Sequence, residues 1–374
     1  MRRIRVLVVD DSVVVRRLVA EALSADPSLE VVGAAANGRI ALARIPQLNP
    51  DLMTLDVEMP DMDGLETLRE LRKTYPRLPV IMFSTMTERG AAATLDALAL
   101  GANDYVTKPS NAGSAALAIE RIREQLIPVI KAHCPGSDGT VTRPARVGRP
   151  CPSVPVLPRR RPSQSLAAPE IVAIGVSTGG PNALAELIPQ LPADLAAPVV
   201  IVQHMPPIFT GLLAERLAAK SRLRVEEGRA GKVIEAGSVW IAPGDFHMVL
   251  RRDGSAVKIA THQEAPENSC RPSVDVLFRS VAEVYGSGAL GVIMTGMGQD
   301  GLRGCERIRE GGGAVLAQDE ASSVIWGMPG LVVRAGLADK VLPLHQLAGE
   351  IARRASRERG PGFGISSPMP LQAG

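Results

Sequence analysis

The sequence predicts an α/β protein of two domains, each built around a parallel sheet. Its 374 residues are too many for one ordinary domain and suit two. In residues 1–131 and 170–355, apolar runs of strand length alternate with helix-like stretches. This βαβ repetition is typical of parallel sheets covered by helices on both faces. Residues 132–169 are rich in proline and arginine and lack this periodicity, so they are expected to form a linker.

The first segment contains five strand-like runs. In chain order they are IRVLVV, EVVGA, DLMTL, LPVIMF and DYVT. Helix-like stretches such as VVVRRLVAEAL and GLETLRELRK separate them. The pattern therefore predicts a five-stranded parallel (βα)5 domain over residues 1–131.

The second segment is richer in strands than in helices around its middle. Its strand-like runs are IVAIGV, APVVIV, SVWIA, HMVL, VKIA, ALGVIM and GAVLAQ. Helices are expected at residues 183–188, 210–219, 274–284, 301–310 and 345–355. We therefore expect a doubly wound, mostly parallel α/β domain over residues 170–355, with a mixed sheet. Residues 356–374, rich in glycine, proline and serine, are expected to form a disordered tail.

The composition excludes several classes of function. A net charge of +3 gives no case for a nucleic-acid footprint, and with only 3% aromatic residues, platforms for stacking bases are scarce. No apolar run reaches membrane-spanning length, and the start of the chain lacks the apolar core of a signal peptide, so we expect a cytoplasmic protein without direct membrane insertion. The cysteines have no C-x-x-C spacing, so we do not expect a structural zinc site or a framework of disulfides.

Polar residues follow the strands of the first segment at their carboxyl ends. Asp10 and Asp11 end the first strand, Asp56 the third and Ser84 the fourth, and Lys108 follows the fifth. Ligands of parallel α/β sheets bind at this edge. Clustered carboxylates repel one another unless a cation joins them, and oxygen ligands suit Mg²⁺. A carboxylate nucleophile beside a metal, an ammonium and a hydroxyl suits phosphoryl transfer, although each residue alone is more often a cap or a surface group.

The motifs VVDDS, LDVEMPDMDG, FST and DYVTKP, in this order, resemble the response-regulator receiver family. The resemblance implies Asp56 as the phospho-acceptor, with a histidine kinase as phosphodonor. It implies Mg²⁺ ligands at Asp10, Asp11, Asp56 and the Glu58 carbonyl. It also implies that Ser84 and Tyr105 form a switch pair and that Lys108 contacts the phosphate.

The second segment carries a candidate nucleophile at a glycine-rich turn. Gly175 to Gly179 satisfy G-x-S-x-G, with Ser177 between a predicted strand and a predicted helix. Glycines permit a tight path there, and the helix N-terminus offers free N–H groups. The alternative is a turn that binds a nucleotide phosphate, although the full dinucleotide fingerprint is absent.

A histidine and an aspartate at other strand ends complete a candidate triad. His204 ends the strand VVIVQ, and Asp300 follows ALGVIM within TGMGQDG. Asp300 has an alternative role as a helix N-cap. The proposed roles are nucleophile for Ser177, general base for His204 and orienting acid for Asp300. Backbone N–H groups near Thr178 or Met297 are candidates for an oxyanion hole.

The order serine, histidine, aspartate differs from that of α/β-hydrolases. The motifs STGGP, QHMPPIFT, APGDFHM, RPSVDVLF and TGMGQDG, spread over residues 170–354, resemble the chemotaxis protein-glutamate methylesterases, the CheB family. The resemblance implies that Ser177, His204 and Asp300 form the triad. It implies hydrolysis of glutamate γ-methyl esters on chemoreceptors with release of methanol, no cofactor for that step, and deamidation of receptor glutamines in many members. It further implies that the unphosphorylated receiver blocks the catalytic serine.

Two other kinds of function compete with this interpretation. A signalling switch could use the STGGP turn only to bind a nucleotide or a partner, but this leaves the pairing of His204 with Asp300 unexplained. A receiver that drives DNA binding would need a basic recognition helix, and no such pattern follows Pro169. Within the enzyme class, the substrate could be a receptor of a related non-motility pathway.

Overall fold

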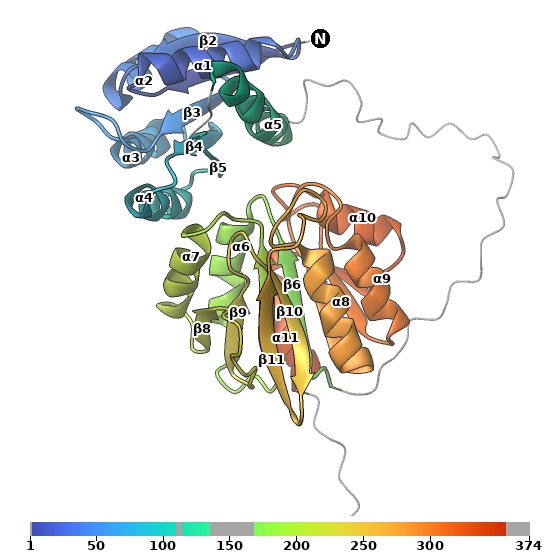
Figure 1. Cartoon of the computed structure of the whole chain (residues 1–374). Coiled ribbons are helices and arrows are strands. Elements are labelled where there is room, and N and C mark those ends of the chain that lie inside the picture. The colour runs from blue at the N-terminus through green and yellow to red at the C-terminus, as the bar shows by residue number, and fades with distance from the viewer. Residues whose placement is uncertain (1, 110–113, 135–167, 357–374) are drawn as a thin grey trace, which may run out of the picture.

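The computed structural model describes residues 2–109, 114–134 and 168–356 (Figure 1). Almost all of the predicted linker and of the predicted tail lies outside these residues. Within the described ranges, none of the helices is both long enough and apolar enough to cross a bilayer.

The N-terminal sheet is parallel, as predicted. Its order is β2-β1-β3-β4-β5. The strands are β1 (Ile4–Val9), β2 (Leu29–Ala35), β3 (Leu52–Asp56), β4 (Val80–Ser84) and β5 (Asp104–Thr107). The helices are α1 (Val13–Ser24), α2 (Gly38–Leu48), α3 (Gly64–Thr74), α4 (Glu88–Ala99) and α5 (Ala115–His133). Every residue of β3 and β4 is buried, because helices cover both faces of the sheet, and this explains their continuous apolar runs.

The C-terminal sheet has seven strands in the order β14-β13-β12-β6-β7-β9-β8. They are β6 (Ile171–Val176), β7 (Val199–Gln203), β8 (Arg224–Glu227), β9 (Ser238–Ile241), β12 (Ala289–Ile293), β13 (Ala314–Gln318) and β14 (Lys340–Leu342). The helices are α6 (Gly180–Leu187), α7 (Phe209–Ala218), α8 (Val274–Tyr285), α9 (Leu302–Glu310), α10 (Met328–Arg334) and α11 (Leu344–Ala355). Two short 3-10 helices lie at Ile188–Gln190 and Gly286–Gly288.

The expectation of a mixed sheet is wrong. All pairings within the seven-stranded sheet are parallel. The antiparallel strands β10 (His247–Asp253) and β11 (Ala256–His262) pair with each other in a separate hairpin. Apolar residues of this hairpin, such as Met248 and Ile259, share a core with α8, so the hairpin is held by packing and not by the sheet.

Strand β6 lies at the point where the strand order reverses. Its neighbours are β7 on one side and β12 on the other. In open α/β sheets this position leaves a crevice at the carboxyl ends of the strands, where ligands bind. The loops that follow β6, β7 and β12 therefore frame the expected site.

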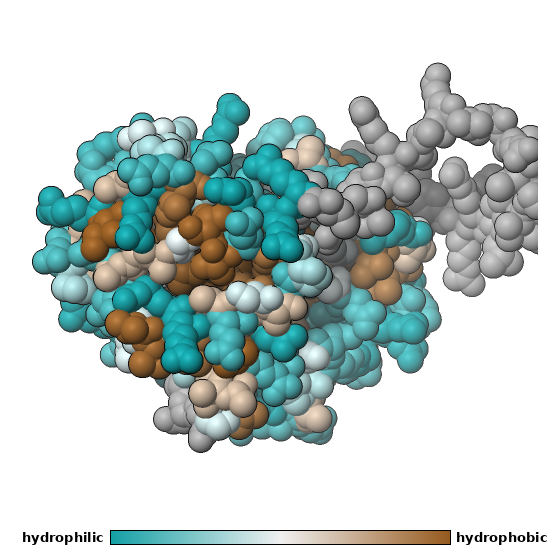
Figure 2. All heavy atoms as spheres, turned by 90° about the horizontal axis from the view of Figure 1, so that it is seen from above, coloured by the Kyte–Doolittle hydropathy of each residue, from teal (hydrophilic) through white to brown (hydrophobic). Residues whose placement is uncertain are grey.

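The two halves meet where α4 faces α7 (Figure 1). The ring of Tyr105, in β5, stacks on that of Phe209 at the start of α7, with centroids 5.0 Å apart. Arg216 of α7 donates to the Ala92 carbonyl at 2.7 Å and pairs with Asp96 at 2.9 Å. Seen from above, onto the N-terminal half, apolar side chains gather in the middle of the face among polar ones (Figure 2).

Candidate active site

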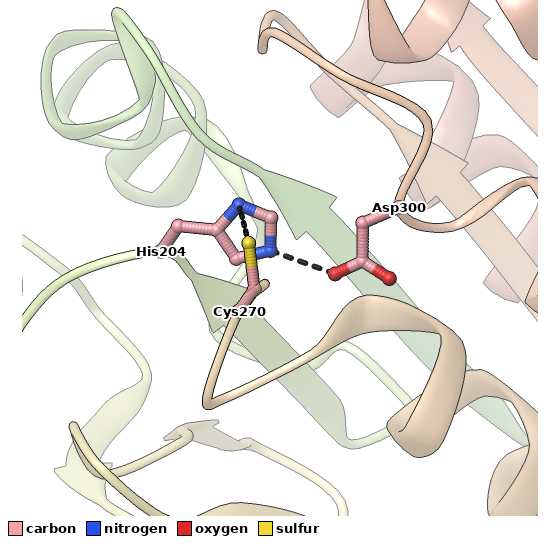
Figure 3. A group of neighbouring side chains, drawn as sticks. All are labelled: His204, Cys270 and Asp300. Carbon is pink, nitrogen blue, oxygen red and sulfur yellow. Dashed lines mark hydrogen bonds and ion pairs between the residues drawn. The ribbon is translucent and has the colours of Figure 1, made fainter. Parts of the chain in front are cut away.

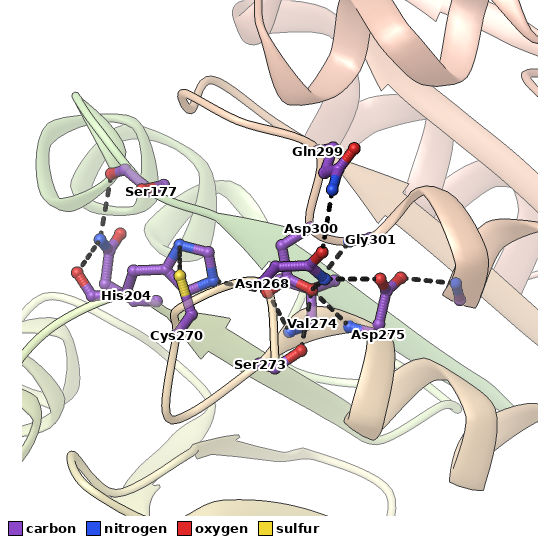
Figure 4. A network of polar contacts seen from close by, with 12 residues as sticks. Ser177, His204, Asn268, Cys270, Ser273, Val274, Asp275, Gln299, Asp300 and Gly301 are labelled. Atoms are coloured by element: carbon purple, nitrogen blue, oxygen red, sulfur yellow. Dashed lines mark hydrogen bonds and ion pairs between the residues drawn. The ribbon is translucent and has the colours of Figure 1, made fainter. Parts of the chain in front are cut away.

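The structure brings Ser177, His204 and Asp300 to the same end of the C-terminal sheet. Val176 pairs with Gln203 across β6 and β7, so Ser177 and His204 follow the two strands side by side. Asp300 lies in the loop between β12 and α9. Gln203 ties the first two turns together, because its Nε2 donates to the carbonyl oxygens of Ser177 (3.0 Å) and His204 (3.2 Å) (Figure 4).

His204 and Asp300 form a buried pair. His204 Nε2 lies 2.8 Å from Asp300 Oδ2, and the side chains are 13% and 1% exposed (Figure 3). Because Asp300 occupies Nε2, the nitrogen left for a nucleophile is Nδ1. Ser177 and His204 line one cavity of about 870 Å³. Among the described contacts, no hydrogen bond joins the Ser177 hydroxyl to the imidazole, and such bonds often tighten only when substrate is bound.

Asp300 is fixed by many donors. Oδ1 accepts from the Ser273 hydroxyl (2.8 Å) and the Asp275 N–H (3.0 Å), and Oδ2 accepts from the Val274 N–H (2.7 Å) (Figure 4). Ser273 is the N-cap residue of α8, so Asp300 binds the N-terminus of that helix. The N-cap of α9 is Gly301, so the alternative that Asp300 caps α9 does not hold.

The pKa values of the pair move apart. Burial alone would lower the pKa of His204, but the hydrogen bonds that the ring donates to Asp300 and Cys270 raise it to about 9. Burial would raise the pKa of Asp300, but the bonds from His204 and from backbone N–H groups of α8 lower it to about 2. The arrangement therefore favours an imidazolium beside a carboxylate, which is the charge state of a triad that has just accepted a proton.

Two amides are free to bind an oxyanion in this cavity. Thr178 and Met297 both line it, and among the described residues neither backbone N–H donates a hydrogen bond. The Ser177 N–H is not available, because it donates to the Thr295 carbonyl at 3.0 Å. Gly296 allows this close approach, since a Cβ there would lie 2.8 Å from Ser177 Cβ.

The predicted carboxylates of the N-terminal sheet also converge. Oxygens of Asp10, Asp11 and Asp56 lie within 4.8 Å of one another. Lys108 Nζ lies 2.8 Å from Asp10 Oδ2 and from Asp56 Oδ2. Asp10 Oδ2 is buried, and Lys108 is its one polar partner among the described residues, so it has a lone pair left for a cation. This all-oxygen set fits Mg²⁺.

Asp56, the predicted phospho-acceptor, is buried within this carboxylate cluster. It is 2% exposed, and burial, aided by the charge of Asp10, raises its pKa to about 6 against the opposing effect of Lys108. The Glu58 N–H contacts Asp56 Oδ1 at 3.4 Å, while the Glu58 side chain faces Arg89 at 3.4 Å.

The side chains of the predicted switch pair, Ser84 and Tyr105, do not contact the carboxylate cluster around Asp56. The Ser84 hydroxyl donates to the Gly90 carbonyl of α4 at 3.1 Å. Tyr105 packs against Phe209, and burial raises the pKa of its phenol. Both side chains are thus engaged with α4 or with the C-terminal half.

Comparison with known proteins assigns the family. The family model for the CheB methylesterase matches residues 172–351, and that for the response regulator receiver domain matches residues 6–120. A protein-glutamate methylesterase/protein-glutamine glutaminase of Trichodesmium erythraeum (strain IMS101) is 58% identical, over 95% of this chain and 99% of its own. This chain belongs to the CheB methylesterase family.

Other members of the CheB family match over similar lengths. Proteins of the same name from Nocardioides sp. (strain ATCC BAA-499 / JS614) and Maricaulis maris (strain MCS10) are 51% and 43% identical. The matches cover 96% and 94% of this chain and 97% and 95% of the relatives. These relatives confirm the predicted family and enzyme class. The two family models and the two parallel sheets confirm the α/β fold of a receiver followed by a catalytic domain. The site residues stay predictions.

Sequence reasoning missed several residues around the triad. Cys270 Sγ lies 3.6 Å from His204 Nδ1, and Asn268 Nδ2 donates to Asp300 Oδ1 at 3.0 Å. Both come from the loop between β11 and α8. Ser273 and Asp275 belong to the quoted motif RPSVDVLF, which was the one available signal that this loop reaches the site.

Proposed function

We propose that this chain is a phosphorylation-activated protein-glutamate methylesterase that also deamidates receptor glutamines. Its substrates would be chemoreceptors, and its phosphodonor a chemotaxis histidine kinase in the cytoplasm. The observation that carries the proposal is the buried pair of His204 and Asp300 beside Ser177, at the switch point of a CheB-family sheet. The names of the relatives support the substrate class. We further propose the division 1–131, 132–169, 170–355 and 356–374 for receiver, linker, catalytic domain and tail.

The proposed chemistry is acyl transfer through Ser177. The Ser177 hydroxyl turns toward His204 Nδ1, gives it the proton and attacks the γ-ester carbonyl. The N–H groups of Thr178 and Met297 receive the negative charge that develops on the carbonyl oxygen. Asp300 holds the other ring nitrogen as a donor and stabilises the imidazolium.

Collapse of the tetrahedral intermediate releases methanol, which takes its proton from the His204 imidazolium. Water then attacks the acyl-serine and gives up a proton to His204, so that glutamate and free Ser177 result. A glutamine amide would follow the same path and release ammonia in place of methanol.

The receiver is proposed to control access to Ser177. Met86, Tyr105 and Gln125 of the receiver line the same cavity as Ser177 and His204. The unphosphorylated receiver domain therefore covers one side of the cavity, the side from which a helix of the chemoreceptor would reach Ser177. Asp56 accepts the phosphoryl group, and Lys108 neutralises its charge. Asp10, Asp11, Asp56 and the Glu58 carbonyl would hold Mg²⁺, which would supply further charge neutralisation.

The proposed movement starts at Ser84. When its hydroxyl turns to the phosphoryl group, it leaves the Gly90 carbonyl in α4. Because Arg216 of α7 is bound to α4 through Ala92 and Asp96, a shift of α4 weakens the contact between the two halves. The stack of Tyr105 on Phe209 lies at the same contact.

Ser177→Ala tests the proposal. We expect it to abolish methanol release from methyl-labelled receptor fragments, because no other hydroxyl is proposed to take its role. Mg²⁺-dependent phosphorylation by a small phosphodonor should persist in the variant, which shows that the receiver is folded, and circular dichroism verifies the fold of the whole chain. Methanol release at the original rate would exclude Ser177 as nucleophile. No methanol release from the unchanged chain would instead favour a protein that only binds a partner at this turn.

A further inference from the structure

Cys270 touches the catalytic histidine on the side that faces the substrate. Its sulfur lies 3.6 Å from His204 Nδ1, while Asp300 occupies Nε2 (Figure 3). Cys270 is partly exposed and lines the same cavity as Ser177 and His204. The esterase chemistry proposed above gives this thiol no role.

The spacing of the two atoms suits a soft metal ion. Zinc binds histidine nitrogen at about 2.0–2.1 Å and cysteine sulfur at about 2.3 Å in tetrahedral sites. Those bonds at a tetrahedral angle set the nitrogen and sulfur about 3.5–3.6 Å apart. The observed separation of 3.6 Å between His204 Nδ1 and Cys270 Sγ has this value without any movement of the backbone.

Asp300 prepares the ring for such a metal from the opposite side. Its bond to Nε2 makes that nitrogen the donor, so the lone pair of the neutral ring lies on Nδ1, toward Cys270. A carboxylate behind a histidine is the common second-layer arrangement of zinc sites. Asp300 itself is not a free ligand, because Ser273, Val274 and Asp275 donate to its oxygens.

We propose that Cys270 and His204 form an inhibitory binding site for Zn²⁺ in the catalytic cavity. Binding releases two protons, one from the Cys270 thiol and one from Nδ1 of the His204 imidazolium. The thiolate sulfur and His204 Nδ1 become two ligands, with water from the cavity completing the shell. The metal then occupies the nitrogen that must accept the proton of Ser177. This site differs in chemistry from the receiver cluster, where only oxygens are offered and Mg²⁺ is preferred.

Metal binding is tested first, without reference to activity. The full chain is kept in excess Mg²⁺, which fills the receiver carboxylates, and is titrated with Co²⁺ while the thiolate-to-cobalt charge-transfer absorption is recorded. We expect an absorption band that saturates at one Co²⁺ ion per chain and that disappears when Zn²⁺ displaces the Co²⁺. Cys270→Ser should lose the band and weaken Zn²⁺ binding more than about tenfold, since one of two protein donors is gone. Cys134→Ser, a change at another partly exposed cysteine, should keep both.

Inhibition is then measured as the ratio of methanol release with and without Zn²⁺, each variant against its own zinc-free rate. The original chain and Cys134→Ser should lose activity at the Zn²⁺ concentration that removes the cobalt band, and a chelator should restore it. In Cys270→Ser the loss should require more than about tenfold more Zn²⁺. A band that survives in Cys270→Ser, or zinc binding that leaves the rate unchanged, would overturn the proposal. The expected inhibition depends on the proposed role of His204 as general base. If the chain without zinc released no methanol, that proposed role would fail, and the cobalt absorption would still show whether the metal site exists.

Discussion

Replacement of Asp300 by asparagine should change which nitrogen of His204 carries the proton. Four donors point at Oδ1, namely the Ser273 hydroxyl and the amides of Asn268, Asp275 and Gly301. Only two face Oδ2, the Val274 N–H and His204. The new side chain therefore keeps its oxygen at the Oδ1 position and presents its NH2 group to the ring. His204 must then accept at Nε2 and hold its proton on Nδ1, where it cannot take one from Ser177.

The size of the effect follows from the charge of the pair. Burial lowers the pKa of His204, but the hydrogen bonds and charges of Asp300 and Cys270 together raise it from 6.5 to about 9. Each tenfold change in proton affinity is worth about 1.4 kcal/mol, so the imidazolium is favoured by roughly 3 kcal/mol. Losing the Asp300 share of that preference costs up to about 10²-fold in rate, and the wrong tautomer brings the expected loss to between about 10² and 10⁴-fold.

Methanol release from methyl-labelled receptor fragments measures this loss, and circular dichroism verifies the fold. Asp275→Asn is the matched control, because Asp275 is also buried at the N-terminus of α8 but contacts Gly304 and Asn268 instead of His204. Its rate should stay within about tenfold of the original chain. A folded Asp300→Asn chain within tenfold of the original rate would refute the reasoning, as would an equal loss in both variants.

Three further results are expected. Asp56→Ala should keep unstimulated methanol release and lose the increase caused by a phosphodonor; equal stimulation would contradict the coupling. Arg216→Ala removes bonds between the two halves worth about 1–3 kcal/mol and should raise the unstimulated rate of methanol release several-fold. Lys220→Ala, at an exposed residue just beyond α7, should leave that rate unchanged. An unchanged rate in both variants would argue against a receiver that blocks the site. The rate of methanol release without zinc should rise as pH approaches about 9, because only neutral His204 accepts a proton. Over the rise from about 6.5 to about 9, the ion pair of His204 with Asp300 stops stabilising the folded chain. A rate that does not change with pH would exclude His204 as the base.

The parallel sheets could be predicted because their strands are buried on both faces and read as apolar runs. β8 and β14 escaped prediction, since both are short edge strands with charged residues, RVEE and KVL. Helix α10 was not predicted, because it begins with Met-Pro-Gly and a sequence with proline and glycine is not typical of a helix. The mixed sheet was wrongly inferred because a sequence does not tell whether a hairpin joins the main sheet or packs beside it.

The candidate triad could be predicted because each member lies in the segment that follows a parallel strand, and the carboxyl ends of adjacent strands meet at one edge. Cys270 and Asn268 could not, because their loop reaches the site only through the packing of α8 and its bonds to Asp300. The engagement of Ser84 with Gly90 was equally hidden, since it depends on the position of α4 and not on the motif around Ser84.

The amide of Gln203 has a consequence for how activation can work. One side chain clamps the main chain at Ser177 and at His204, so these two turns are expected to shift as one unit when α7 is pulled or released. Phosphorylation should therefore uncover a reaction centre that is already assembled, and a small soluble ester able to slip past the receiver should be cleaved at nearly the same speed in either state.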